Sequence, residues 1–163
     1  MISVKMQEAI NMQINMELWS AYLYLSMSLD AREKGLKGVA HWLRHHCDEE
    51  MQHAFRFMRY MEKQMAKVRL FPIAEVPVTW DSPSSMFAHA LQHEQKITSY
   101  IHHIYALAQD ERDYATSGFL QWFVDEQVEE EETVSEKLSA FKCLAADKAA
   151  LYLYDSQLKE ENS

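Results

Sequence analysis

Residues 48–53 read Asp-Glu-Glu-Met-Gln-His, and residues 125–130 read Asp-Glu-Gln-Val-Glu-Glu. A shift of 77 positions places one stretch on the other and matches the first two acids of each. The same shift relates three pairs of polar residues, which are Glu17 and Glu94, Glu50 and Gln127, and His53 and Glu130. These six polar residues occupy corresponding places in two halves of the chain, whose patterns repeat.

The six polar residues interrupt stripes of apolar residues. Around Glu17, for example, Ile10, Ile14, Ala21 and Tyr24 follow one another at steps of three and four residues. Such spacing is typical of amphipathic helices that pack in a bundle. A carboxylate on an apolar face is unfavourable unless something compensates its charge. A bound metal ion is the obvious compensating group.

The pattern predicts an all-α fold, a single domain over residues 1–163. Four long helices are expected over 4–34, 37–66, 83–110 and 114–143. A short fifth helix is expected over about 147–159, and its apolar residues are Leu151, Leu153, Tyr154 and Leu158. The first three of these have no obvious place in a four-helix core, so the helix could serve assembly.

The segment 67–82 separates the second helix from the third. It contains two prolines and several β-branched residues, which favour extended chain. Ser82 and Pro83 are a plausible N-cap and first residue of the third helix. Helices of roughly 30 residues are about 45 Å long, so a second and third helix that run parallel need a long crossover. The sequence therefore predicts a bundle with such a crossover.

Turns are expected near position 35, where Gly35 and Gly38 mark one, and near position 112, in a polar run. Glu17 and His53 each lie 18 residues from the first turn, and Glu94 and Glu130 each lie 18 from the second. At about 1.5 Å per residue, all four lie about 27 Å from their turns. The six polar residues can therefore converge in one layer.

The composition excludes several classes of function. Of the 163 residues, 48% are hydrophobic, enough for a real core, but no apolar run is long enough to span a bilayer and the N-terminus lacks a secretory signal. The net charge of −9 argues against nucleic acid or an anionic membrane as a partner. Cys47 and Cys143 form no paired motif and are expected to be buried or half-buried thiols. A soluble, cytoplasmic protein is expected.

Glu50 and His53 carry the metal chemistry. Their spacing puts a carboxylate and an imidazole on one helical face, where both can reach one ion. An oxygen-rich set with one imidazole suits iron or manganese better than structural zinc. Two such ions bridged by Glu50 would neutralise the buried acids.

Gln127 replaces a carboxylate in the second half, and a neutral amide is a poor ligand, so the second ion should be held more loosely. Loose binding favours storage over a fixed cofactor.

Other interpretations stay open for several of these residues. The buried acids could form a hydrogen-bond network without metal, although no lysine or arginine shares their stripes. Gln127 and Tyr24 could be plain core residues. His46 lies one turn from Glu50 and could support the ligands or simply fill the core.

The acidic run 126–132 would usually be a solvated helical face, as we expect for Glu131 and Glu132. Glu126 and Glu129 lie one turn apart beside the centre and are better candidates for ligands. The acids at positions 110, 111 and 113 could solvate a turn or line an iron-entry pore.

Over nearly its whole length the sequence resembles the bacterial non-haem ferritins. The resemblance rests on five segments, which are Asn-Met-Glu-Leu at 15–18, Leu-Arg-His-His at 43–46, Glu-Glu-Met-Gln-His at 49–53, His-Glu-Gln at 93–95 and Phe-Leu-Gln-Trp-Phe-Val-Asp-Glu-Gln at 119–127. It implies that the first iron binds Glu17, Glu50 and His53, and that the second binds Glu50, Glu94 and Glu130 with Gln127 nearby. It also implies that Tyr24 lies beside the centre and that a third iron binds Glu49, Glu126, Glu129 and Glu130.

The resemblance further implies a shell of twenty-four copies, oxidation of Fe(II) by O2 or H2O2, and a ferric mineral inside. The leading hypothesis is thus an iron-storing ferroxidase with two iron ions per subunit, a possible third, and no haem. Met51 stands where bacterioferritins place a haem-ligating methionine, so a haem-containing bacterioferritin is an alternative. A soluble di-iron oxidase or peroxidase without storage and a metal-free helical scaffold are the others.

Overall fold

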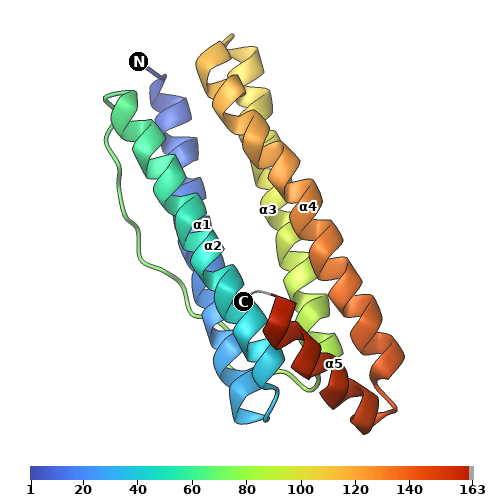
Figure 1. The fold of residues 1–163 in the computed structure, drawn as a ribbon. Coiled ribbons are helices and arrows are strands. Elements are labelled where there is room, and N and C mark those ends of the chain that lie inside the picture. The colour runs from blue at the N-terminus through green and yellow to red at the C-terminus, as the bar shows by residue number, and fades with distance from the viewer. Residues whose placement is uncertain (162–163) are drawn as a thin grey trace.

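The computed structural model describes residues 1–161, which form helices and connecting segments without a strand. The five helices are α1 (Val4–Glu33), α2 (Lys37–Lys63), α3 (Pro83–Asp110), α4 (Tyr114–Leu144) and α5 (Lys148–Glu161). Figure 1 shows α1 with α2 and α3 with α4 as two antiparallel pairs that lie side by side. The predicted four-helix bundle with a short fifth helix is confirmed.

The helix ends follow from the local sequence. Ser82 caps α3 by accepting the backbone N–H of Ser85, and Pro83 is the first residue of the helix, as predicted. The side chain of Asp113 caps α4 in the same way. Helix α2 ends at Lys63, three residues before the predicted end at 66, because the backbone at Met65 turns to a φ of 54°.

The crossover, residues 64–82, runs along the α1–α2 pair from one end of the bundle to the other (Figure 1). Asn11, Trp19 and Ser26 of α1 hydrogen-bond to its backbone between residues 67 and 77. These contacts satisfy polar groups that an extended chain leaves without partners of its own. The predicted extended crossover is confirmed, and α2 and α3 run parallel.

The apolar core has two parts, one toward each end of the bundle. Trp42, Phe87 and Phe141 belong to the part near α5, and Ile10 and Phe57 belong to the part at the other end. Each long helix carries one or two of the six polar residues, and they lie between the residues of the two apolar sets. Each of the six residues is at most 5% exposed, so a buried polar layer divides the core at mid-height.

Helix α5 packs on α2 and completes the protomer. Leu158 is fully buried, and Leu151 and Tyr154 pack against the core. The expectation that Leu151 and Tyr154 have no place against the four-helix core is therefore wrong, because α5 folds back over the end of the bundle (Figure 1). Leu153 is 64% exposed and remains available for assembly.

Asp155 fixes α5 to the start of α2. Its buried carboxylate accepts the backbone N–H groups of Gly38 at 3.1 Å and Val39 at 2.8 Å, which no residue of α2 itself can satisfy. A Cβ atom at Gly38 would overlap the backbone carbonyl of Asp155. Gly38 therefore allows the close approach of α5, whereas Gly35, with a φ of +80°, forms the turn.

The two cysteines differ in exposure. Cys47 is buried, as expected. Cys143 is exposed, contrary to the expectation, because it lies in the last turn of α4, next to but outside the core that contains Phe141. Within residues 1–161, no helix is both long and apolar enough to cross a membrane.

Candidate metal centre

The polar layer draws on all four long helices. Glu17 comes from α1, Glu50 and His53 from α2, Glu94 from α3, and Gln127 and Glu130 from α4. All six side chains are buried. They lie between the two apolar sets of the core, which agrees with the single layer expected from the distances to the turns.

Glu17, Glu50 and His53 form the first compact group. One potential ligand atom from each lies within 4.8 Å of the others. The Nδ1 atom of His53 is 3.4 Å from a Glu50 oxygen and 3.9 Å from a Glu17 oxygen. Gln13 donates to one oxygen of Glu17 at 2.8 Å, while the other oxygen, the one nearest His53, is buried and accepts no hydrogen bond from residues 1–161. Such an orphaned acceptor is costly, and a cation bound among these three residues would satisfy it.

Glu94 lies in the same layer but is held differently. Tyr24 donates its hydroxyl proton to Glu94 Oε1 at 2.6 Å, and Gln127 donates through Nε2 to Glu94 Oε2 at 3.2 Å. Gln127 also reaches Thr98 Oγ1 at 3.2 Å. Among residues 1–161, Glu94 belongs to no compact group of three metal-ligating residues. A cation at Glu94 therefore has to compete with the Tyr24 and Gln127 hydrogen bonds.

Glu130 takes part in two further compact groups, one with His46 and Glu49 and one with His53 and Glu126. His46 Nε2 is 3.5 Å from a Glu130 oxygen, and the His46 ring stacks on Trp42 at 3.7 Å between ring centres. His46 therefore fills the core and also contacts a candidate ligand, so both interpretations of His46, core filling and ligand support, hold.

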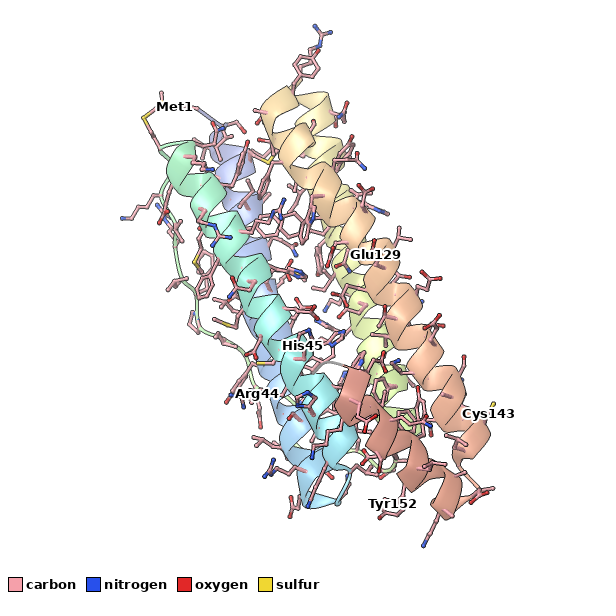
Figure 2. All side chains as sticks on the ribbon, viewed as in Figure 1. Met1, Arg44, His45, Glu129, Cys143 and Tyr152 are labelled. Carbon is pink, nitrogen blue, oxygen red and sulfur yellow. The ribbon has the colours of Figure 1, made fainter. Side chains whose placement is uncertain are left out.

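A pocket of about 200 Å³ opens beside these groups between α2 and α4. His45 on α2 and Glu129 on α4, both labelled in Figure 2, line it together with Glu49 and Glu126. The four acids that the resemblance assigns to a third iron thus share this pocket, because Glu130 lines it too. Acidic side chains therefore connect the pocket with the buried polar layer, because Glu130 belongs to both.

The electrostatics show a site built for positive charge. Burial, reinforced by the charge of Glu50, raises the pKa of Glu17 well above its usual value, and burial with the charge of Glu94 does the same to the pKa of Glu50. Burial and the charge of Glu130 raise the pKa of Glu94 to about 7. Without a cation, these carboxyl groups take up protons instead.

Glu130 and His46 behave as an ion pair. Burial opposes ionisation of both, but the hydrogen bond and opposite charge across the pair outweigh it. The pKa of Glu130 is consequently lowered and the pKa of His46 raised. Burial raises the pKa of Tyr24 well above its usual value, so this phenol keeps its proton as a donor to Glu94.

Sequence reasoning missed two supporting residues. Gln13 orients Glu17 from one turn earlier on α1, and Thr98 accepts from Gln127 one turn after Glu94. Both are polar residues four positions from an acid in the stripes, which is the signal that could have found them. Thr98 also donates to Glu131 at 2.6 Å, so Glu131 is more than a solvated acid, while Glu132 is exposed as expected.

The acids at the α3–α4 turn have local partners. Asp113 caps α4, and Glu111 accepts a hydrogen bond from Ser3 at 2.7 Å, whereas Asp110 is exposed. Their part in an iron-entry pore stays a prediction. Met51 is half-buried and packs against the core near α5.

Comparisons with known proteins show the family and the fold of the chain. Residues 7–144 match the model of the ferritin family, described as a ferritin-like domain. A bacterial non-heme ferritin from Bacteroides fragilis is 40% identical over 158 residues, which cover 97% of this chain and 98% of that protein. One from Staphylococcus aureus is 30% identical, with 97% and 95% covered. The open pore ferritin of the archaeon Archaeoglobus fulgidus superposes with a TM-score of 0.96 at 42% identity, covering 98% of both chains.

Proposed function

The chain belongs to the ferritin family and is an iron-storage protein, and we propose that it oxidises Fe(II) at the buried centre before storing it as a ferric mineral. The observation that carries the proposal is the first compact group. Side chains of three metal-binding residues from two helices meet there, and one buried oxygen of Glu17 accepts no hydrogen bond from the residues that the structure describes.

Each side chain has a proposed role. Glu17, Glu50 and His53 bind the first Fe(II), and Glu50, Glu94 and Glu130 bind the second, with Gln127 beside it. Each Fe(II) gives up one electron, and the two electrons with two protons convert O2 to H2O2. Carboxyl groups with raised pKa values release protons when the cations bind, so protons are available at the centre itself.

Transfer from the centre has a proposed route through the pocket between α2 and α4. Glu130 belongs to a group with His53 and to a group with His46 and Glu49, so it faces both the buried layer and the pocket. We assign the third iron to this pocket, with Glu49, Glu126, Glu129 and Glu130 as ligands. Loose binding at Glu94, where hydrogen bonds from Tyr24 and Gln127 compete, favours departure of oxidised iron.

Storage requires a closed shell, and we propose that it contains twenty-four copies of this chain. At 19.2 kDa per copy, the shell would have a mass of about 460 kDa.

The test adds several hundred Fe(II) per shell in air and measures the sedimentation of protein and ferric absorbance together. We expect both in one particle of that mass. A monomer or dimer that oxidises iron but leaves it outside the protein would favour an oxidase without storage.

A further inference from the structure

Three cationic side chains follow one another on one face of α2, beyond the iron centre. They are Arg56, Arg59 and Lys63, spaced three and four residues apart, so they lie on neighbouring turns. The protein has a net charge of −9, with 25 acids available as partners. Nevertheless, none of the carboxylates described in residues 1–161 lies within 4.0 Å of these three cations.

These cations surround a pocket with an aromatic wall. The pocket has a volume of about 300 Å³ and is lined by the three cations with Tyr60 and Phe119. The two aromatic rings stack at 4.0 Å between centres and are nearly parallel, and the Tyr60 hydroxyl is fixed by a 2.7 Å hydrogen bond with Thr116. The wall is therefore rigid, and the cations on its rim are the polar groups that can meet a ligand.

Arg56 is held in place before any ligand arrives. Its guanidinium carbon lies 3.8 Å from the centre of the Trp122 ring, a cation–π contact that fixes the planar group. A fixed guanidinium presents paired N–H donors that match two oxygens of an oxyanion. The other side of the site is open, because Arg59 and Lys63 are exposed and can close on a ligand.

Ordinary roles account for only part of this cluster. Lys63 lies in the last turn of α2, where the helix dipole favours a cation. The dipole effect falls off within that turn and does not explain the two arginines. Asp113 is near enough to influence Tyr60, but its carboxylate is engaged as the N-cap of α4 by Thr116. The excess positive charge in the pocket is thus left for a partner from outside.

We propose that the pocket formed by Arg56, Arg59, Lys63, Tyr60 and Phe119 binds inorganic phosphate. The volume admits a small oxyanion with its water, and the three cations more than neutralise the charge that phosphate carries at neutral pH. The site adjoins the iron centre, because Trp122 touches Arg56 on one side and lies 5.5 Å from the His53 ring on another. Phosphate held there would meet ferric ions as they leave. The binding itself does not depend on the proposed oxidation.

The test is calorimetric titration of iron-free protein with inorganic phosphate at low ionic strength. Arg59→Gln with Lys63→Gln removes two charges from the pocket and should weaken binding about tenfold or more. Lys37→Gln with Arg44→Gln removes the same charge from the other half of α2 and should leave binding within about twofold. Circular dichroism and sedimentation check that both proteins stay folded and assembled.

The proposal is supported if phosphate binding by the wild-type protein weakens with added salt and if only the pocket variant binds about tenfold or more weakly. Equal weakening of phosphate binding in both variants would show an effect of net charge alone and would overturn the proposal. The absence of phosphate binding by the wild-type protein would also overturn it. Titration with adenosine monophosphate separates the free anion from a phosphate ester. Tighter binding of the ester would contradict the assignment to inorganic phosphate.

Discussion

Glu94 is held between the Tyr24 hydroxyl and the Gln127 amide, and both donate to it. These donors lower the cost of ionising a fully buried carboxylate, yet its pKa still rises to about 7. Within residues 1–161, Glu17 has one hydrogen-bond donor, Gln13, and its second oxygen accepts no hydrogen bond. The two halves of the centre thus differ, with the first prepared for a cation and the second occupied by protein hydrogen bonds.

Replacing Gln127 with Glu tests this asymmetry. The change removes the amide donor to Glu94 and adds a carboxylate, so it should strengthen iron binding in the second half. We expect the first addition of two Fe(II) per subunit to oxidise rapidly, whereas recovery of fast oxidation before the next addition should take several times longer. Stopped-flow absorbance with timed repeat additions measures both. Recovery as fast as in the wild-type protein would remove Gln127 from the control of iron release.

Residue types and spacing were enough to predict that the six polar residues share a layer, because helical geometry converts sequence distance into depth. They could not predict that Glu94 faces Tyr24 and Gln127, whereas Glu130 faces His46. Those choices depend on side-chain conformations and on the packing of Trp42 against His46, which sequence spacing does not determine.

At the scale of elements, the long helices follow from local signals. Capping by Ser82 and the turn at Gly35 could be predicted because each rests on neighbouring residues. The position of α5 could not, since it depends on a contact between Gly38 and Asp155, 117 residues apart. A glycine near a turn looked like part of that turn, although its role is to admit another helix.

Gly38→Ala should therefore loosen α5. The added methyl group meets the Asp155 backbone, and overpacking of this kind costs about 1–3 kcal/mol. We expect a lower midpoint of thermal unfolding, measured at fixed protein concentration, and faster proteolysis after residue 144. Gly118→Ala is the matched control, because no atom lies within 4 Å of its added Cβ and alanine favours helix. If both variants are equally stable, the contact does not hold α5.

At the scale of the whole molecule, the polar layer divides the core and reduces the stability of the iron-free protein. The carboxyl groups of Glu17, Glu50 and Glu94 have pKa values above those in an unfolded chain. The folded protein consequently holds more protons than the unfolded chain once the pH exceeds about 4.5. These three carboxyl groups contribute their full stabilisation at lower pH. The stabilisation is lost as the pH rises through the pKa values of the groups in the folded protein.

The iron-free protein should accordingly unfold at a lower temperature at pH 8 than at pH 5. The rise of the Glu94 pKa from 4.5 to about 7 alone corresponds to about 3 kcal/mol per protomer. The raised pKa of His46 also makes the folded protein less stable as the pH rises. The lowered pKa of Glu130 affects the stability only at more acidic pH. Zn²⁺, which does not oxidise, should remove most of the difference. Calorimetry in matched buffers that shows higher stability at pH 8 would contradict this.

The central claim is that the buried layer oxidises iron in pairs, and the amplitude of the first oxidation phase tests it most directly. Fe(II) is added to iron-free protein under argon and mixed with O2 in a stopped-flow instrument, using the wild-type protein, His53→Ala and His103→Ala. His103 is an exposed histidine of α3 and controls for loss of an imidazole.

We predict a fast phase that saturates at two Fe(II) per subunit in the wild-type protein and in His103→Ala. The phase should be at least about tenfold slower in His53→Ala, since even groups that only orient ligands contribute that much. An unchanged fast phase in His53→Ala, or saturation at one Fe(II) per subunit in the wild-type protein, would contradict the account.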